Sequence, residues 1–323
     1  MPHTPTLIVR RATATLGALA LVLGASACNR GGEDTAAGGA GGGESAELTL
    51  AVSTLNNPFF IELRDGAQAA ADEAGAELTV VDAQNDAAVQ ANQLANAQTQ
   101  GVDAVIVNPV DSEAAGPAVA PLVESGIPVV AADRAVEGAE VATTVSSDNV
   151  EGGRQAAQAL AEAIGGSGRI IVLQGVPGTS ASRDRGQGFT EGIAEFPGVE
   201  VVASQPANFD RNTALDVATN LLQANPDVVG VFAENDEMAL GAIQALGDRA
   251  GSQVQVVGFD GTDEGLAAVQ DGTMYATVAQ LPAELGRTAV EQALAVIEGE
   301  TVEETVPVPV ETVTAENVGD FTE

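Results

Sequence analysis

Polar residues follow five short apolar runs of the chain, each at the point where the run ends. The runs are rich in valine and isoleucine, which is typical of buried strands in parallel sheets. The polar residues that follow them are Asn108, Asp133 with Arg134, Asn235, Asp260 and Gln280. Any one of these could be a turn former or a helix cap. Ligands of open parallel sheets bind outside the carboxyl ends of the strands, so five such positions together predict one shared ligand site.

The chemistry of these side chains suits a small polyol. Amides both donate and accept hydrogen bonds, carboxylates accept them and guanidinium groups donate them, which is what several hydroxyls require. Three of the eight phenylalanines, Phe59, Phe60 and Phe209, stand beside expected helix starts near the site. Core packing would explain each ring alone. Aromatic faces attract the polarised C–H groups of a sugar ring, so the rings and the polar set together predict a monosaccharide site.

The composition excludes several other functions. The chain has 46 acidic and 12 basic residues, a formal charge of -34, and all the basic residues are arginines. Without lysine there is no Schiff base and no Walker phosphate loop. The single histidine, His3, and the single cysteine, Cys28, lie at the N-terminus, so the body has no Ser-His-Asp triad and no His/Cys zinc site. We expect no enzyme activity, cofactor or metal, and the acidity disfavours nucleic acid and anionic membrane surfaces.

The N-terminus has the pattern of an export signal. Arg10 and Arg11 precede an apolar stretch, 12–23, and small residues that end at Cys28. Residues 1–27 are therefore expected to be a signal peptide, and residues 28–46 a lipidated cysteine followed by a flexible linker. The end of the signal resembles the bacterial lipobox, although Ala25 stands where that motif usually has leucine. An ordinary signal with an incidental cysteine is the alternative. The expected location is the periplasm or the outer face of the cytoplasmic membrane, with the lipid as the only membrane attachment.

From Glu47 onward, short strand patterns alternate with helical patterns. Strands are expected at 48–53, 78–82, 104–108 and 127–132, and then at 170–173, 199–203, 228–232, 254–259 and 276–279. Helices of the second set are expected to begin near Ser182, Arg211, Asp236 and Asp263. This order predicts an α/β fold. Because one core would not comfortably hold both sets, we expect two doubly wound parallel-sheet lobes.

Longer strings of residues resemble the ribose-binding proteins of bacterial sugar ABC transporters, within the type I periplasmic binding proteins. The strings extend across 47–310 and include 51–60 (AVSTLNNPFF), 108–112 (NPVDS), 147–150 (SDNV), 178–181 (GTSA) with 183–186 (RDRG), 209–211 (FDR), 235–241 (NDEMALG), 257–262 (VGFDGT) and 280–282 (QLP). The resemblance implies a three-segment hinge, with crossings near Ser147, Gln280 and Val310. It thereby implies an N-terminal lobe of 47–147 plus 281–309 and a C-terminal lobe of 148–280 plus 310–323.

The resemblance also implies a ligand site. The N-terminal lobe would contribute Asn57, Phe59, Phe60, Asn108, Asp133 and Arg134, and the C-terminal lobe Arg185, Phe209, Asn235, Asp260 and Gln280. The implied ligand is a monosaccharide, first D-ribose, and the implied partner of this monomer is an ABC transporter permease. Allose, xylose or an autoinducer furanose are alternative ligands, and a sensory lipoprotein that presents its closed form to a chemoreceptor or sensor is an alternative role. A repressor of the lactose type would need a DNA-reading helix pair where this chain has its export signal.

Overall fold

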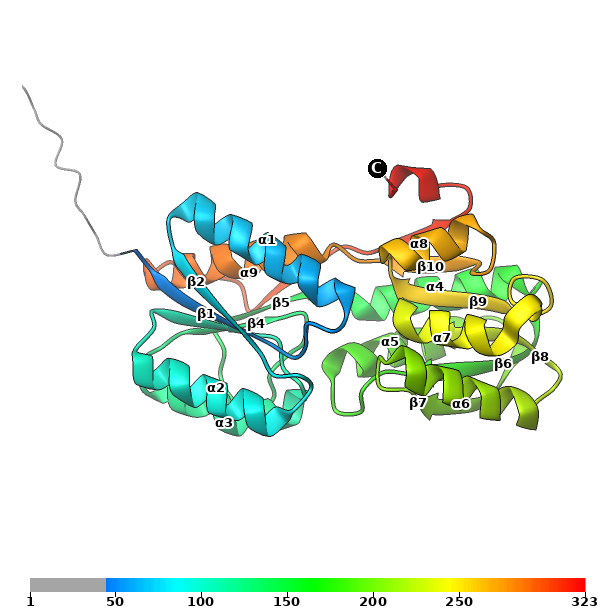
Figure 1. The fold of residues 1–323 in the computed structure, drawn as a ribbon, viewed down its shortest axis with the longest axis horizontal. Helices are drawn as coiled ribbons and strands as arrows, with labels where there is room; N and C mark the ends of the chain where they lie inside the picture. The colour runs from blue at the N-terminus through cyan, green and yellow to red at the C-terminus, as the bar shows by residue number, and fades with distance from the viewer. Residues whose placement is uncertain (1–44, 323) are drawn as a thin grey trace, which may run out of the picture. The chain divides into compact units, whose positions relative to one another are not determined.

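The computed structural model describes residues 45–322, which belong to one unit made of two α/β lobes (Figure 1). Each lobe is built on one six-stranded sheet. The predicted signal peptide, Cys28 and the predicted linker up to residue 44 lie outside the described residues. Within residues 45–322, no helix is both long enough and apolar enough to cross a bilayer.

The sheet of the first lobe is entirely parallel, with the strand order β11-β5-β4-β3-β1-β2. Its strands are β1 (Glu47–Val52), β2 (Glu77–Asp82), β3 (Ala104–Val107), β4 (Val129–Ala132), β5 (Thr143–Ser147) and β11 (Thr305–Val308). Helices α1 (Pro58–Ala74) and α9 (Pro282–Ile297) cover one face, and α2 (Ala87–Gln100) and α3 (Ser112–Glu124) cover the other (Figure 1). Both faces of the sheet are therefore buried, which accounts for the nearly continuous apolar strands.

The sheet of the second lobe has the order β12-β10-β9-β8-β6-β7. Its strands are β6 (Ser167–Gln174), β7 (Gly198–Pro206), β8 (Val228–Ala233), β9 (Gln255–Asp260), β10 (Ala276–Ala279) and the antiparallel β12 (Glu311–Thr314). Helices α4 (Asn149–Ala163) and α5 (Ser180–Ile193) pack on one face. Helices α6 (Arg211–Ala224), α7 (Asp236–Leu246) and α8 (Asp263–Gln270) pack on the other. Short 3₁₀ turns occupy Gly247–Arg249 and Val318–Asp320.

The predicted fold class is confirmed, with differences in three strands. All nine expected strands are present to within a few residues, and three of the four expected helix starts are at the predicted residue, while α5 begins at Ser180. Strands β5, β11 and β12 were not predicted, and β12 departs from the parallel arrangement. These strands are short and only partly buried, and β11 is an edge strand that contains Pro307. Their weak apolar pattern explains why the sequence did not reveal them.

The chain passes between the two lobes three times. The passages lie between β5 and α4, between β10 and α9, and between β11 and β12. They fall close to Ser147, Gln280 and Val310. We propose that they divide the chain into lobes of 47–147 with 281–309 and 148–280 with 310–323.

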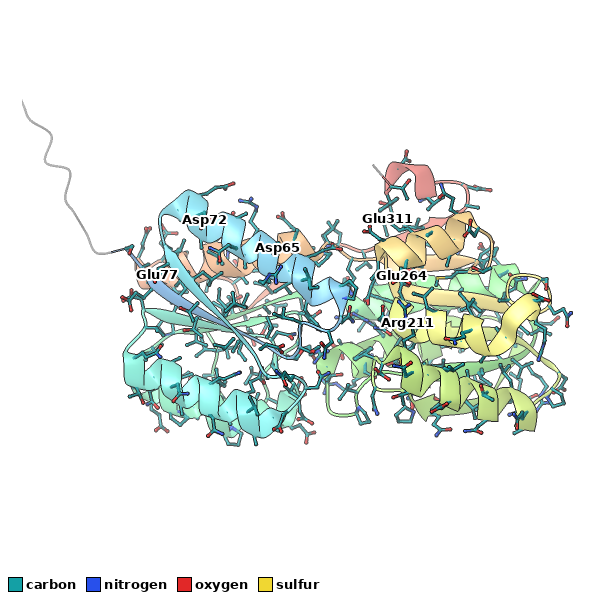
Figure 2. All side chains as sticks on the ribbon, viewed as in Figure 1. Asp65, Asp72, Glu77, Arg211, Glu264 and Glu311 are labelled. Carbon is teal, nitrogen blue, oxygen red and sulfur yellow. The ribbon has the colours of Figure 1, made fainter. Side chains whose placement is uncertain are left out.

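Acidic side chains point outward from both lobes. Asp65 and Asp72 project from α1, and Glu264 and Glu311 project from the second lobe (Figure 2). Arg211, at the start of α6, is paired with Glu264 at 2.8 Å. These groups are solvated, so this part of the negative charge lies on the surface of the protein.

Candidate functional site

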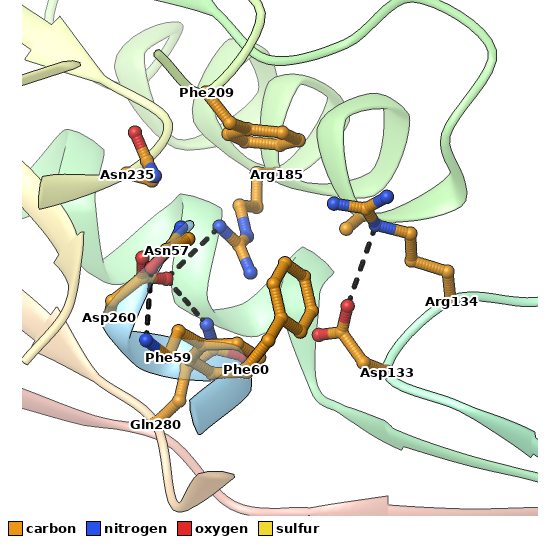
Figure 3. A pocket seen from close by; sticks show the side chains of 11 residues that line it. Asn57, Phe59, Phe60, Asp133, Arg134, Arg185, Phe209, Asn235, Asp260 and Gln280 are labelled. Atoms are coloured by element: carbon orange, nitrogen blue, oxygen red, sulfur yellow. Dashed lines mark hydrogen bonds and ion pairs between the residues drawn. The ribbon is translucent and has the colours of Figure 1, made fainter. Parts of the chain in front are cut away.

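One cavity lies between the two lobes, and its empty volume is about 250 Å³. Eleven residues line it, ten of which the sequence analysis singled out (Figure 3). The lining residues are Asn57, Phe59, Phe60, Asp133, Arg134, Ala181, Arg185, Phe209, Asn235, Asp260 and Gln280. The eleventh candidate, Asn108, is fully buried and is not a lining residue.

The N-terminus of α1 places two of the aromatic rings. Asn57 caps the helix, because its Oδ1 accepts a hydrogen bond from the Phe59 N–H at 2.9 Å, and Pro58 occupies the first helical position. Phe59 and Phe60 therefore lie in the first turn, and their rings meet edge to face with centroids 5.1 Å apart. The cap sequence thus directs both rings toward the end of the sheet where the cavity lies.

Phe209 supplies an aromatic ring from the other lobe. It lies between β7 and α6 with a φ of 56°, a conformation that few residues other than glycine adopt. Its ring lies over the backbone of Gly175, where a Cβ atom would be only 2.0 Å from the ring. The Arg134 guanidinium carbon is 5.3 Å from the Phe60 centroid and 5.6 Å from the Phe209 centroid. The two rings and the arginine form one wall of the cavity (Figure 3).

Arg185 and Asp260 form the charged pair of the second lobe. Arg185 Nη1 is 3.5 Å from Asp260 Oδ1, which also accepts a hydrogen bond from Gln280 Nε2 at 2.7 Å. Arg185 Nε donates to Asn149 Oδ1 at 2.8 Å, and its guanidinium carbon lies 3.8 Å from the Phe259 centroid. The guanidinium is therefore held on several sides before any ligand enters.

Asp133 and Arg134 form the corresponding pair of the first lobe. Arg134 Nε is 3.5 Å from Asp133 Oδ2, and Arg134 Nη1 donates to the Pro109 carbonyl at 2.9 Å. Asn108 lies behind this pair. Its Nδ2 donates to Asp133 Oδ2 at 2.9 Å, while its Oδ1 accepts from the Ser53 N–H at 3.1 Å. Asn108 is therefore placed to orient the Asp133 carboxyl group toward the cavity.

Burial shifts the pKa of both carboxyl groups. It raises the pKa of Asp133, against the lowering effects of Arg134, Arg185 and the Asn108 hydrogen bond. It also raises the pKa of Asp260 well above its ordinary value, against the effect of Arg185. Burial likewise lowers the pKa of Arg134. Two carboxylates and two guanidinium groups balance in charge, so the cavity suits a neutral polar ligand.

Three of the lining residues hold strained backbone conformations. Asp133, Phe209 and Asp260 have φ values of 65°, 56° and 125°. Such conformations cost of order 1–3 kcal/mol each and persist where the surrounding structure enforces them, which is typical of binding sites.

Three buried polar atoms of lining residues have no hydrogen-bond partner in the described part of the chain. They are Arg134 Nε, Asn235 Nδ2 and Gln280 Oε1. Asn235 Oδ1 is already used, because it caps α7 by accepting from the Met238 N–H at 3.0 Å. Two donors and one acceptor are thus free, and an unpaired buried polar atom costs about 1–3 kcal/mol. A ligand that carries hydroxyl groups could satisfy all three.

Backbone groups of the two lobes also meet directly beside the cavity. The Ser112 N–H donates to the Gly178 carbonyl at 3.0 Å, and the Ser180 N–H donates to Ser112 Oγ at 3.0 Å. Ser180 Oγ in turn accepts from the Ala135 N–H at 2.9 Å. These bonds exist only when the lobes are close together, so the structure is that of a closed form.

Three residues of the candidate site were not predicted from the sequence. Ala181 lines the cavity, Asn149 holds Arg185, and Glu234 holds the loop next to it. Ala181 and Asn149 both lie within strings that carry the family resemblance, which was the available signal. Glu234 follows the expected strand 228–232 and was given no role. Within residues 45–322, no cluster of three His, Cys, Asp or Glu side chains could hold a metal ion.

Comparison with known proteins identifies the family. Residues 48–301 match the family described as the periplasmic binding protein domain. The chain belongs to the periplasmic binding protein family. It is 48% identical to the ribose import binding protein of Escherichia coli K12 over 261 residues, which cover 81% of this chain and 88% of that protein. It is 45% identical to the ribose import binding protein of Bacillus subtilis 168 over 269 residues, which cover 83% and 87%.

A solved structure extends this family relationship to the fold. An ABC transporter periplasmic solute binding protein from Actinobacillus succinogenes, with bound D-allose, superimposes with a TM-score of 0.80 at 35% identity. The match covers 85% of this chain and 100% of that one. The periplasmic binding protein described here is thus homologous to sugar-binding proteins of ABC importers in both sequence and fold.

Proposed function

We propose that this periplasmic binding protein captures D-ribose in the cavity between its lobes and delivers it to the permease of an ABC importer. One observation carries the proposal: a small cavity between the lobes is lined by polar and aromatic side chains from both of them, and some of its donor and acceptor atoms have no hydrogen-bond partner among the described residues. The identity to ribose import binding proteins supports ribose as the ligand. We propose Asn57, Phe59, Phe60, Asp133, Arg134, Arg185, Phe209, Asn235, Asp260 and Gln280 as the ligand contacts, with Asn108 acting through Asp133.

The division of the ligand contacts between the two lobes explains how ligand binding would close the lobes. Each lobe supplies only part of the groups that a buried sugar needs, so an open form would leave hydroxyls without partners. Bound ligand therefore shifts the population toward the closed form. The hydrogen bonds of Ser112 and Ser180 across the lobes add to that preference. The permease would recognise the closed surface and receive the sugar when the lobes separate.

Selectivity would come from buried polar groups and from the aromatic wall. An epimer that leaves Asp133, Arg134 or Asp260 unpaired loses on the order of 1–3 kcal/mol for each group. The hydroxymethyl group of a hexose would meet Phe60 or Phe209. We infer that pentoses are preferred over hexoses.

A different sugar is the second candidate. The homologous solute binding protein from Actinobacillus succinogenes contains D-allose, which makes allose the first competitor to test, followed by xylose and an autoinducer furanose. Calorimetric titration of the purified protein with each sugar separates these ligands. Ribose should bind at least tenfold more tightly than any other sugar, and a tighter complex with allose would overturn the ribose assignment.

Asn235→Asp provides a sharper test of the site. Aspartate caps a helix as well as asparagine does, so α7 should be preserved. The substitution replaces the free Nδ2 donor with an acceptor, and we expect ribose affinity to fall about tenfold or more. Asp86→Asn, the reverse exchange at the cap of α2, is the matched control and should leave affinity unchanged. Equal affinities of the Asn235→Asp variant and the unmodified protein would remove Asn235 from the site.

The family is that of exported binding proteins. We propose that residues 1–27 direct the export and that Cys28 carries a lipid anchor. Incorporation of labelled palmitate that is abolished in Cys28→Ser would support the lipid anchor, and labelling that persists in the variant would refute it. We further propose that the protein is a monomer that binds without catalysing a reaction. A sensory role remains the alternative to transport, and loss of ribose uptake on gene deletion would favour transport.

A further inference from the structure

Glu234 is a fully buried carboxyl group directly behind the cavity. It follows β8 and precedes the lining residue Asn235, but it does not line the cavity itself. Its backbone N–H donates to the Leu173 carbonyl at 3.0 Å, so the end of β8 is attached to β6. The position of the side chain is therefore fixed at the point where two neighbouring strands end.

The Glu234 carboxylate connects this point to the segment that leads into α5. Its Oε2 accepts hydrogen bonds from the Gly175 N–H, at 2.7 Å, and from the Ser182 hydroxyl. Its Oε1 has no hydrogen-bond partner among the described residues. Oε1 lies 3.2 Å from the position that a Cβ atom at Gly186 would occupy. One carboxylate thus contacts the loop after β6 and two turns of α5.

Each of these two partners of Glu234, Gly175 and Ser182, lies next to a residue that lines the cavity. Gly175 is the backbone on which the Phe209 ring lies. Ser182 precedes Arg185 by one helical turn, and Arg185 Nη1 donates to the backbone carbonyl of Glu234 at 2.6 Å. The placement of an aromatic wall residue and of a cavity guanidinium thus depends on the same buried group.

The charge of Glu234 is finely balanced. Burial raises its pKa to about 7, while the hydrogen bonds from Gly175 and Ser182 and the charge of Arg185 act to lower it. Arg185, on α5, is the one charged side chain among the described residues that acts on it; the loop after β6 contributes only the Gly175 amide. Hydrogen bonds to an ionised carboxylate are about twice as strong as those to a neutral group, so protonation would loosen both attachments.

We propose that Glu234 is a positioning residue that, in its ionised form, holds Phe209 and Arg185 in place for the ligand, so that ligand affinity falls when Glu234 is protonated. The inference rests on the proposed function, because it concerns the same cavity. It adds a pH response that the lining residues alone do not specify.

Calorimetric titration with D-ribose at about pH 8 and about pH 5.5 tests the proposal. Glu234→Gln keeps an acceptor oxygen but has no charge, and it resembles the protonated side chain in shape. The unmodified protein should bind about tenfold more weakly at the lower pH. The variant should show most of that weakening at both pH values, and Glu195→Gln, an exposed exchange just beyond α5, should behave like the unmodified protein. A Glu234→Gln variant with the full pH response, or with undiminished affinity at pH 8, would overturn the inference.

A measurement without ligand separates this inference from the proposed function. The amide proton shift of Gly175 reports on the hydrogen bond to Glu234, so it should titrate with a midpoint near 7 in the ligand-free protein and stay constant in Glu234→Gln. If ribose fails to bind at either pH, the proposed function is wrong while this titration still decides the role of Glu234. A Gly175 amide that does not respond between about pH 5 and pH 9 would refute it.

Discussion

Replacing Gly175 with alanine should weaken sugar binding without touching the sugar. The added Cβ atom would be 2.0 Å from Phe209 Cζ and 2.4 Å from two further ring atoms. Ordinary contacts begin near 3.4 Å, so the ring must retreat by more than 1 Å toward the cavity. Gly175 does not have a positive φ, so alanine brings no backbone strain of its own.

The size of the effect follows from the free energy needed to return the Phe209 ring to its original position. Forcing an extra methyl group into a packed site costs about 1–3 kcal/mol, and displacement of Phe209 relieves that strain only in the empty protein. A bound sugar requires the ring to return, so the strain reappears as lost affinity. We expect the dissociation constant for ribose to rise about fivefold to 150-fold, as each 1.4 kcal/mol corresponds to a factor of ten.

A double-mutant cycle isolates this mechanism. Calorimetry would measure ribose affinity for Gly175→Ala, Phe209→Ala and the double variant, with the thermal midpoint of each ligand-free protein as the folding control. In the Phe209→Ala background, the alanine at 175 should change affinity by less than about twofold, because no ring remains to be displaced. An equal loss in both backgrounds would refute the reasoning, since Gly175→Ala would then act through some other contact.

Three further predictions concern charge and closure. The pKa of Glu234 in the folded protein, about 7, exceeds its ordinary value of 4.5. As pH rises between these values, the unfolding free energy measured with urea should therefore fall by about 3 kcal/mol more in the unmodified protein than in Glu234→Gln, and an equal fall in both would contradict this contribution. Asp260→Asn removes the charge beside Arg185, and asparagine, like aspartate, can adopt a positive φ. Calorimetry should show ribose binding that is at least thirtyfold weaker, and a smaller loss would contradict the role of this pair. Ser180→Ala removes the hydroxyl that accepts a hydrogen bond from the Ala135 amide, so ribose affinity should fall about threefold to tenfold. Small-angle scattering should show that the ligand-free variant is more open than the unmodified protein. Unchanged affinity would mean that this bond does not favour closure.

The sequence predicted the residues that line the cavity more completely than it predicted the strands of the sheets. Asn235, Asp260 and Gln280 could be found because each follows an apolar strand, and the position of a strand's end is a local property of the chain. The helix start beside Phe59 and Phe60 is local in the same way, and both residues lie in the first turn of α1. Composition alone was sufficient to exclude lysine and histidine chemistry from the body of the chain.

Other features depend on residues that are distant in sequence. Asn108 has the same strand-end pattern as its neighbours, yet it lies behind Asp133, because the pairing of β3 with β4 decides which of the two side chains faces the cavity. Glu234 could not be found from the sequence, since nothing local reveals that the amide of Gly175, 59 residues away, donates to it. Residue types and the ends of strands can be recognised from the sequence itself. Burial, unpaired atoms and shifted pKa values arise only when folding brings distant segments of the two lobes together.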